Sequence, residues 1–331
     1  MCHFFLNHLH QLDSTALNSS YENHVNCTGV SSLLTKYFLP VAYAVDCGFA
    51  VTGNILAIFV YIFHMRPWKS NTVIMFNLAM ADVLYVSSLP FFVYYYALDQ
   101  GWTLGEFLCK FLRLMFHMNM YGGIMCLTCI SVFRYIAITR PMLRQRIRKK
   151  KWAIAACVIV WMIVLTELLP ILHVFTIEYK NNTVICYDYG STPDIEKAIT
   201  YSWVLNILGF LLPMVIVFIC YISIARILTL GPCASHSRKI RARRLTIIIL
   251  FMFIICFMPY HIMRSVRLYS RTAVTSCQTE DAINAVYIVT RPLAGLSPCF
   301  NLIFYVLAGD NFQQALINLF KCQKGGPTTV G

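Results

Sequence analysis

Seven apolar stretches dominate the chain and restrict the folds that it can adopt. Each is long enough to cross a hydrocarbon core of ~30 Å, which takes about 20 helical residues. They cover residues 37–63, 71–98, 107–138, 152–174, 199–228, 245–268 and 283–307. Charged residues make up only 12% of the chain, about half of their usual share in soluble domains. A backbone inside a bilayer must satisfy its own hydrogen bonds, so we predict an all-α membrane protein, a seven-transmembrane helix bundle.

Positive charges gather in two connecting segments and set the expected orientation. The segment after the third stretch has seven basic residues and no acid, and the segment before the sixth has five basic residues and no acid. Basic connections of this kind stay on the cytoplasmic side. We therefore predict a plasma-membrane protein with an extracellular, glycosylated N-terminus over 1–36. A seven-transmembrane domain follows over 37–308, then an amphipathic helix and a short cytoplasmic tail over 309–331.

Candidate modification sites agree with this orientation. Asparagine acceptor patterns for glycosylation begin at Asn18, Asn26 and Asn181, all on segments predicted to face outward. Residues 310–320 have the apolar spacing of a short helix that lies on the inner leaflet. Cys322 follows this helix directly and is a candidate for palmitoylation.

Four cysteines map to the outer side of the predicted bundle. The outer compartment is oxidising, so these cysteines can form two disulfides, and the sequence alone allows three pairings. They are Cys27, Cys109, Cys186 and Cys277.

A group of basic residues within the apolar stretches has no acid near its members in sequence. They are Arg113, His117, Arg264, Arg267 and Arg291. A charge at membrane depth costs at least ~2.5 kcal/mol even on lenient insertion scales, so such residues face an internal cavity or a partner. The expected partner is a small anion.

The spacing of these residues predicts where the anion binds. Arg113 and His117 are four residues apart and share one helix face, Arg264 follows His261 by three residues, and Arg291 lies about two turns into the last stretch. Three helices can thus converge on one cavity. The planar arginine fork offers paired donors to a carboxylate, so a dicarboxylate could be clamped between Arg113 and either Arg264 or Arg291. Desolvation offsets much of the gain, and we expect micromolar to millimolar affinity.

Several of these residues also have a simpler interpretation. Arg267 can extend to the outer membrane interface instead of touching a ligand. His117 and His261 can be hydrogen-bonded packing residues, and if His117 contacts the ligand the response should depend on pH, because a free histidine titrates near ~6.5. Tyr94 to Tyr96 and Tyr260 can line the pocket or belong to an aromatic belt.

Single residues at fixed places in the stretches resemble those of rhodopsin-like G protein-coupled receptors. The features are Gly53-Asn54, the segment from Asn77 to Asp82, Cys109, Phe133-Arg134-Tyr135, Trp161, Pro213 with Tyr221, Cys256-Phe257-Met258-Pro259, and the segment from Asn301 to Tyr305. The resemblance extends from about Tyr37 to Cys322. It implies a heterotrimeric G protein of the Gq or Gi class as the partner, the lipid bilayer as the environment, and signalling roles for Arg134, Tyr221, Tyr305, Phe257, Asp82 and Asn301.

Further segments narrow the resemblance to receptors for dicarboxylates. Met65 to Ser70, Arg113 with His117, Ala242 to Ile247, Tyr287 to Ala294 and Asp310 to Ala315 are similar to the 2-oxoglutarate receptors, and Glu167 to Leu172 is similar to the succinate receptors. Both groups belong to a nucleotide-receptor-like branch. The branch implies disulfides Cys109–Cys186 and Cys27–Cys277, and an ion pair of Asp188 with Arg291 that acts as a lid over the pocket.

Three positions depart from the usual family pattern. Phe133 stands where the family usually has an acid that restrains Arg134 in the resting state. The loss of this restraint could raise basal activity. Leu302 replaces a proline and removes a forced break in the last helix. Gly123 replaces a hydroxyl that often helps to bind sodium; the remaining candidate ligands for sodium are Asp82, Asn119, Ser297 and Asn301.

The sequence therefore predicts a G protein-coupled receptor for a small dicarboxylate such as 2-oxoglutarate, itaconate or succinate. A nucleotide or cysteinyl-leukotriene receptor is the alternative within the same class. An organic-anion transporter could use the same arginines, but transporters usually contain internal repeats, which this sequence lacks. We expect no enzymatic activity, no cofactor and no nucleic-acid partner.

Overall fold

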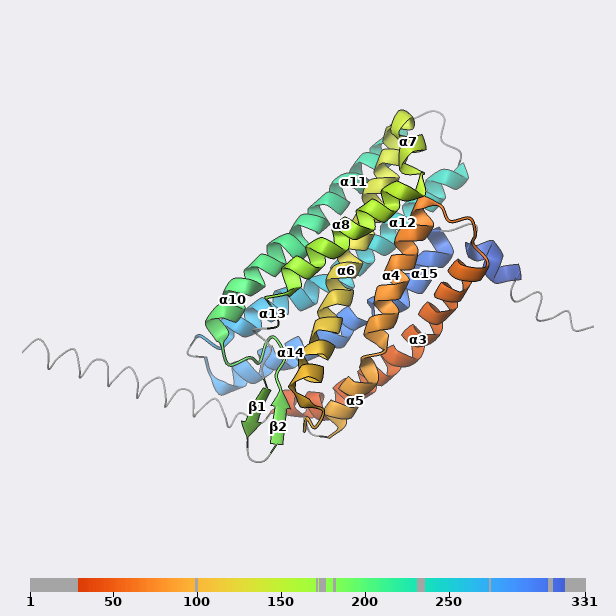
Figure 1. Cartoon of the computed structure of the whole chain (residues 1–331). Helices are drawn as coiled ribbons and strands as arrows, with labels where there is room; N and C mark the ends of the chain where they lie inside the picture. The colour runs from red at the N-terminus through yellow and green to blue at the C-terminus, as the bar shows by residue number, and fades with distance from the viewer. Residues whose placement is uncertain are drawn as a thin grey trace, which may run out of the picture.

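The computed structural model describes residues 29–98, 101–170, 172, 177–180, 183–230, 236–273, 275–308 and 312–318. Six of its helical segments are long and apolar enough to cross a membrane: Val30–Phe63, Ser70–Ala97, Gly105–Thr139, Lys150–Leu168, Ile195–Thr229 and Ala242–Ser270. A seventh segment, Cys277–Leu307, meets the requirement together with the short helix Phe312–Asn318, from which it is bent. The predicted all-α, seven-helix bundle is confirmed (Figure 1).

Several of the seven crossings are built from more than one helical element. In chain order these are α2 (Val30–Leu33), the π-helix η1 (Leu34–Phe38) and α3 (Leu39–Phe63); α4 (Ser70–Val86) and α5 (Leu89–Ala97); α6 (Gly105–Thr139); α8 (Lys150–Leu168); α10 (Ile195–Val204), η2 (Leu205–Leu211) and α11 (Leu212–Leu230); α12 (His236–Phe251), η3 (Met252–Phe257) and α13 (Met258–Ser270); and α14 (Cys277–Gly295) and α15 (Ser297–Ala308). The short helix α7 (Pro141–Ile147) joins the third crossing to the fourth.

Prolines explain most of the irregular turns. Each π-helical segment in the described part of the chain ends two residues before a proline, namely Pro40, Pro213 or Pro259. Proline has no N–H for the helix ladder, and its ring clashes with the carbonyl four residues earlier. A widened turn accommodates that clash. Within the predicted fourth stretch, 152–174, helix α8 ends at Leu168, two residues before Pro170.

The last crossing breaks earlier than the usual motif position. Leu302 lies inside the continuous helix α15, and the break falls at Leu296, after Pro292 and Gly295. A Cβ at Gly53 would lie 3.1 Å from Leu302 Cδ2. Leu302 thus packs closely on α3, and the break in the last crossing lies six residues before it, at Leu296.

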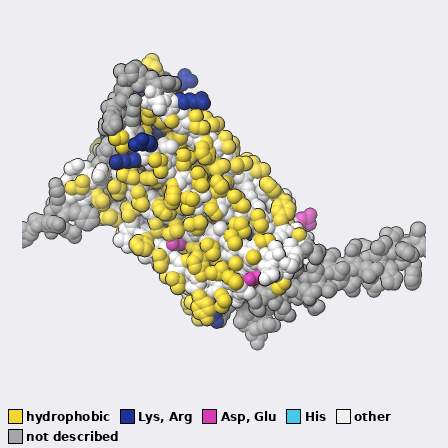
Figure 2. Space-filling model, turned by 180° about the vertical axis from the view of Figure 1, so that it is seen from behind, with side chains coloured by type: hydrophobic (Ala, Val, Ile, Leu, Met, Phe, Trp, Pro, Cys, Tyr) yellow, Lys and Arg dark blue, Asp and Glu magenta, His cyan; other side chains and the backbone are white. Residues whose placement is uncertain are grey.

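A two-stranded hairpin closes one end of the bundle and was not predicted. Strand β1 (Ile177–Lys180) pairs antiparallel with β2 (Thr183–Cys186), with Ile177 opposite Cys186. The hairpin and α7 lie at opposite ends of the bundle (Figure 1). Figure 2 shows apolar side chains over the middle of one face and lysine and arginine side chains at the α7 end. The basic side chains therefore gather at the end of the bundle opposite the hairpin.

Candidate anion-binding site

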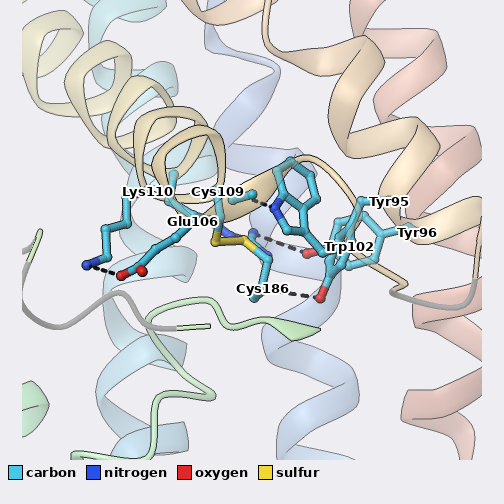
Figure 3. The surroundings of a disulfide bond; sticks show 9 residues. Tyr95, Tyr96, Trp102, Glu106, Cys109, Lys110 and Cys186 are labelled. Atoms are coloured by element: carbon cyan, nitrogen blue, oxygen red, sulfur yellow. Dashed lines mark hydrogen bonds and ion pairs between the residues drawn. A yellow bond between two sulfur atoms is a disulfide. The ribbon is translucent and has the colours of Figure 1, made fainter. Parts of the chain in front are cut away.

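Helix α6 places three of the predicted residues on one face. Cys109, Arg113 and His117 follow each other at intervals of four residues, which puts them above one another along the helix. A disulfide joins Cys109 to Cys186 at the end of β2 (Figure 3). The main-chain oxygen of Cys186 then accepts hydrogen bonds from Arg113 Nη2 at 3.0 Å and from the Tyr95 hydroxyl at 3.1 Å. The disulfide thus fixes the loop backbone over Arg113.

Aromatic rings of α5 surround Arg113. Its guanidinium carbon lies 5.2 Å from the centre of the Phe92 ring and 5.8 Å from that of Tyr95. Its Nη1 donates to the Tyr96 hydroxyl at 3.2 Å. Only 5% of the residue is exposed. Ring faces attract a guanidinium, so this burial is tolerated without an acid in contact with Arg113 among the described residues.

Arg291 on α14 meets Arg113 at the same tyrosine. Its Nη1 donates to the Tyr96 hydroxyl at 3.0 Å and forms an ion pair with Asp188 Oδ2 at 2.6 Å. The Tyr287 hydroxyl donates to the same carboxylate oxygen at 3.4 Å. Two buried guanidinium groups therefore share one hydroxyl acceptor, and of these two only Arg291 is in contact with a carboxylate of a described residue.

The nearby arginines stabilise the ionised form of Asp188. Burial disfavours the carboxylate, but the nearby positive charges of Arg291 and then Arg113 outweigh it and keep the pKa of Asp188 below its usual value. Asp188 is therefore ionised throughout the physiological pH range. The predicted partners Asp188 and Arg291 are in contact in this structure.

A cavity of about 250 Å³ lies over this group at the hairpin end. Tyr96, Arg113, Asp188 and Arg291 line it, together with loop residues 185–187 and residues of α2, η1 and α14. A second cavity of about 20 Å³, which is room for about one water, is also lined by Arg113, Asp188 and Arg291. These three side chains thus separate the larger outer cavity from the small inner one.

His117 and Tyr260 line the inner cavity. His117 Nδ1 lies 2.8 Å from the main-chain oxygen of Arg113, and the Tyr260 hydroxyl lies 3.4 Å from Nε2. Because a carbonyl oxygen can only accept, Nδ1 donates the proton and Nε2 is left to accept from Tyr260. The neutral imidazole satisfies both contacts.

Arg264 on α13 forms a second cationic position beside the inner cavity. It is completely buried and donates from Nη1 to the Tyr121 hydroxyl at 2.8 Å and from Nη2 to Asn206 Oδ1 at 2.5 Å. Its guanidinium lies against the rings of Tyr189 and Tyr260, at 5.1 and 5.5 Å. Those two rings line the inner cavity, so they separate Arg264 from Arg113 and Arg291.

The other basic candidates of α13 lie away from both cavities. His261 Nδ1 contacts the same oxygen of Asn206 at 2.9 Å, and its ring stacks on Phe210 at 4.4 Å. Arg267 forms an ion pair with Glu280 at 2.7 Å. Neither residue is part of the cavity lining. His261 therefore belongs to the packing around Arg264. The charge of Arg267 is neutralised by Glu280, away from both cavities.

The tyrosines of α5 divide between two faces. Tyr94 is 44% exposed, whereas Tyr95 and Tyr96 are 1% and 2% exposed. Of the candidates Tyr94 to Tyr96, the structure therefore places Tyr96, and not Tyr94, in the cavity lining. Sequence reasoning missed Tyr43, Tyr121 and Asn206. Within a run of aromatic residues, composition gives no signal as to which ring faces inward.

The predicted signalling residues form two groups deeper in the bundle. Asp82 accepts hydrogen bonds from Asn119 at 2.8 Å, Asn301 at 2.7 Å and the Tyr305 hydroxyl at 3.2 Å. Both carboxylate oxygens are therefore bonded to protein groups. Ser297 is buried on α15 without a hydrogen bond to Asp82 among those described.

The second group lies toward the basic end. Arg134 lies beside the Tyr221 hydroxyl, which also accepts from Ser131 at 3.3 Å. Phe257 is fully buried and packs edge-on against Phe253.

Several predicted positions lie outside the described residues. These are Asn18, Asn26, Cys27, Asn181 and Cys322. Cys277, the expected partner of Cys27, is disulfide-bonded.

A bundle of seven crossings with a hairpin tethered over a charged cavity defines a membrane receptor of the seven-helix class. The chain belongs to the rhodopsin family of seven-transmembrane receptors, because the family model "7 transmembrane receptor (rhodopsin family)" matches residues 53–305. The members of this family are G protein-coupled receptors and not enzymes, so the resemblance inferred from the motifs is confirmed. Family membership also favours a receptor over an organic-anion transporter.

Named relatives support a narrower grouping. The chain is 42% identical to the 2-oxoglutarate receptor 1 of Mus musculus, over 97% of this chain and 96% of the relative. It is 36% identical to a purinoceptor of Homo sapiens, over 92% of this chain and 81% of the relative. Similarity to both types of receptor matches the branch that the motifs indicated.

Proposed function

We propose that the chain is a receptor for a small dicarboxylate, with 2-oxoglutarate as the first candidate, and that it binds this ligand at Arg113 and Arg291. The observation that carries the proposal is the meeting of these two buried arginines at the Tyr96 hydroxyl, below a cavity at the hairpin end. A like-charged pair in contact with a single acid attracts a further anion. The relative with 42% identity is named a 2-oxoglutarate receptor.

The charges of the residues around the two cavities fit a dianion. Arg113, Arg264 and Arg291 contribute three positive charges, and Asp188 contributes one negative charge, which leaves a net charge of +2. Arg267 is balanced separately by Glu280. A dicarboxylate would neutralise this excess, with one carboxylate on the Arg113 and Arg291 side and the other directed toward Arg264. Reaching Arg264 requires the Tyr189 and Tyr260 rings to move apart.

The size of the cavity favours a metabolite over a nucleotide. Pockets for drug-sized ligands usually measure about 300–1,000 Å³, and this cavity measures about 250 Å³. A nucleotide or a cysteinyl-leukotriene would need the cavity to open further. The similarity to a purinoceptor nevertheless makes a nucleotide receptor the second candidate.

Asp188 would act as a lid that the ligand has to compete with. Its carboxylate occupies the Arg291 donor at 2.6 Å, where a ligand carboxylate would otherwise bind. Each charge-assisted hydrogen bond contributes roughly 1.5–3 kcal/mol. Because the ligand carboxylate replaces the bond that Asp188 already makes, binding gains only part of this free energy. Affinity in the micromolar to millimolar range follows from this competition.

Binding would bias the receptor toward a pre-existing active state. The proposed orientation puts the hairpin end and the N-terminus outside the cell and the basic end inside, in line with the positive-inside rule. Arg134 and Tyr221 at the basic end would then face the G protein, which we expect to be of the Gq or Gi class. Phe133 beside Arg134 gives no acidic restraint, so we expect measurable ligand-independent signalling.

A second-messenger assay on transfected cells tests the proposal. Calcium and cyclic AMP are measured against 2-oxoglutarate, itaconate, succinate, nucleotides and cysteinyl-leukotrienes. We expect a response to one of the dicarboxylates that Arg113→Ala and Arg264→Ala each abolish. Arg267→Ala, three residues after Arg264 on the same helix, is the matched control and should retain the response. Surface expression is measured with an N-terminal tag on intact cells.

Three results would contradict parts of this proposal. Normal dicarboxylate responses in both arginine variants would overturn the pocket assignment. A response to nucleotides alone would replace the first candidate by the second. An N-terminal tag that antibodies reach only after permeabilisation would reverse the orientation.

A further inference from the structure

Asp46 is a buried acid of α3, near the middle of the first crossing Val30–Phe63, that the ligand site does not use. It is 3% exposed, and its Oδ2 has no hydrogen-bond partner among the described residues. The other acid at this level of the bundle, Asp82, accepts three hydrogen bonds. An unpaired carboxylate at membrane depth is expensive and marks a functional site more often than a defect. Of these two acids, Asp46 is therefore the one with a carboxylate oxygen that lacks a hydrogen-bond partner among the described residues.

A second unpartnered oxygen lies beside Asp46. The Tyr85 hydroxyl on α4 is buried and also has no hydrogen-bond partner in the described part of the chain. A Cβ built on Gly295 would lie 2.5 Å from the Tyr85 hydroxyl and 3.3 Å from Asp46 Oδ2. Both oxygens thus face one point next to the backbone of α14. Glycine is required there, because any side chain would fill the space between them.

Among the described residues, none of the titratable groups that interact electrostatically with Asp46 is a base. These groups are Tyr43, Cys47, Tyr85, Cys256 and Cys299. The charged groups further along α14 and α4 have their own partners. Arg291 forms an ion pair with Asp188, and Asp82 accepts three hydrogen bonds. The negative charge of Asp46 is consequently not matched by a described cationic side chain.

We propose that Asp46 and Tyr85 bind a monovalent cation, either sodium or a proton, in the space beside Gly295. A carboxylate and a phenolic oxygen are hard donors that suit sodium. A proton would instead let the Asp46 carboxyl donate to the Tyr85 oxygen. Either occupant neutralises the buried charge and joins α3, α4 and α14 at one point. This site is distinct from the sodium position predicted at Asp82.

The site is coupled to the outer cavities through two helices. Tyr43, one turn before Asp46 on α3, lines the inner cavity. Arg291 lies one turn before Gly295 on α14 and reaches the outer cavity. A bound cation would hold these two turns in one relative position. The inference does not depend on which anion the receptor binds.

Thermal unfolding of the purified, ligand-free receptor tests the site. Melting temperatures are measured in sodium chloride and in N-methyl-D-glucamine chloride at equal ionic strength, and separately from pH 8 to pH 6 without sodium. The variants are Asp46→Asn, which keeps the shape without the charge, Tyr85→Phe, and Asp82→Asn as the control acid. The change that the cation causes is compared between variants, because removing a buried charge alters the melting temperature itself.

We expect sodium to raise the melting temperature of the wild type and of Asp82→Asn by about 2–4 °C. Asp46→Asn should lose this rise, and Tyr85→Phe should reduce it. If the bound cation is a proton, sodium has no effect, and lowering the pH stabilises the wild type but not Asp46→Asn. A sodium effect that Asp82→Asn removes and Asp46→Asn retains would overturn the proposal. So would equal responses of Asp46→Asn and the wild type to both sodium and pH.

Discussion

Tyr96 is the residue at which the two buried arginines of the proposed site meet. Its hydroxyl lies 3.2 Å from Arg113 Nη1 and 3.0 Å from Arg291 Nη1, and its ring lies against both guanidinium groups. A single acceptor thereby sets the spacing of two positive charges that repel each other. That spacing decides how a carboxylate can bridge them.

We predict that Tyr96→Phe weakens the dicarboxylate response and that Tyr94→Phe does not. The first change leaves two buried guanidinium donors without their acceptor, at a cost of roughly 1–3 kcal/mol, which corresponds to about a 5- to 150-fold loss of potency. Tyr94 is 44% exposed and lies on the other face of α5. Dose–response curves in transfected cells, normalised to surface expression, measure the difference. Equal potency of the two variants would contradict the role given to Tyr96.

The same two tyrosines show what residue patterns could and could not predict. The spacing of Arg113 and His117 placed them on one face of α6, because i and i+4 are neighbours on any helix. Periodicity did not identify the inward tyrosine, because a helix that faces lipid on one side and aromatic packing on the other is apolar all round. Burial and the contacts with Arg113 and Arg291 distinguish Tyr96 from Tyr94.

At the scale of elements, the helices that pack against α13 determine which partners its arginines contact. Arg264 faces η2, where Asn206 accepts from it at 2.5 Å. Arg267 faces α14, where Glu280 lies 2.7 Å away. The two arginines are three residues apart, so the sequence placed them on similar faces. Their different partners come from helices distant in the chain, and such tertiary contacts leave no signature in local spacing.

Packing between η2 and α6 positions the partner of Arg264. A Cβ at Gly209 would lie 2.6 Å from Tyr121 Cε1. Glycine thus lets the Tyr121 ring approach the backbone of η2, with its hydroxyl 2.8 Å from Arg264 Nη1.

We predict that Gly209→Ala destabilises the receptor and displaces Tyr121 from Arg264. Overpacking of this kind costs typically 1–3 kcal/mol, or several degrees of melting temperature. Gly48→Ala is the matched control, since a Cβ there meets nothing within 4 Å. Thermal unfolding of the purified variants measures the effect. A Gly209→Ala receptor as stable as Gly48→Ala would show that η2 and α6 are not packed as described.

At the scale of the whole molecule, the seven crossings could be predicted from the sequence, but the hairpin that covers the cavity could not. Hydrophobic length and basic loops were sufficient for seven crossings. The hairpin β1–β2 was missed, because its strands are short and lie next to apolar stretches. That hairpin, tied to α6 by Cys109–Cys186, brings Asp188 down onto Arg291. The proposed lid over the cavity therefore depends on the connection between the fourth and fifth crossings, and not on any single helix.

The lid should be insensitive to mild acid. Arg291 and Arg113 overcome the effect of burial and keep the pKa of Asp188 below its usual value. A carboxylate with a depressed pKa stabilises the folded state above its unfolded value of about 3.9, and this contribution is lost only as the pH falls through the lower folded value. Between pH 7.4 and pH 5.5 Asp188 is ionised in both states, so its contribution stays constant.

We therefore predict that Asp188→Asn lowers the melting temperature by the same amount at pH 7.4 and at pH 5.5. Removing one partner of a buried ion pair costs on the order of 3–5 kcal/mol, because Arg291 then stays buried without its acid. Below about pH 4 the wild type should approach the variant. A difference that already shrinks between pH 7.4 and pH 5.5 would mean that Asp188 takes up a proton there. In that case acidification alone would open the lid, and the ligand would no longer have to displace an ionised carboxylate from Arg291.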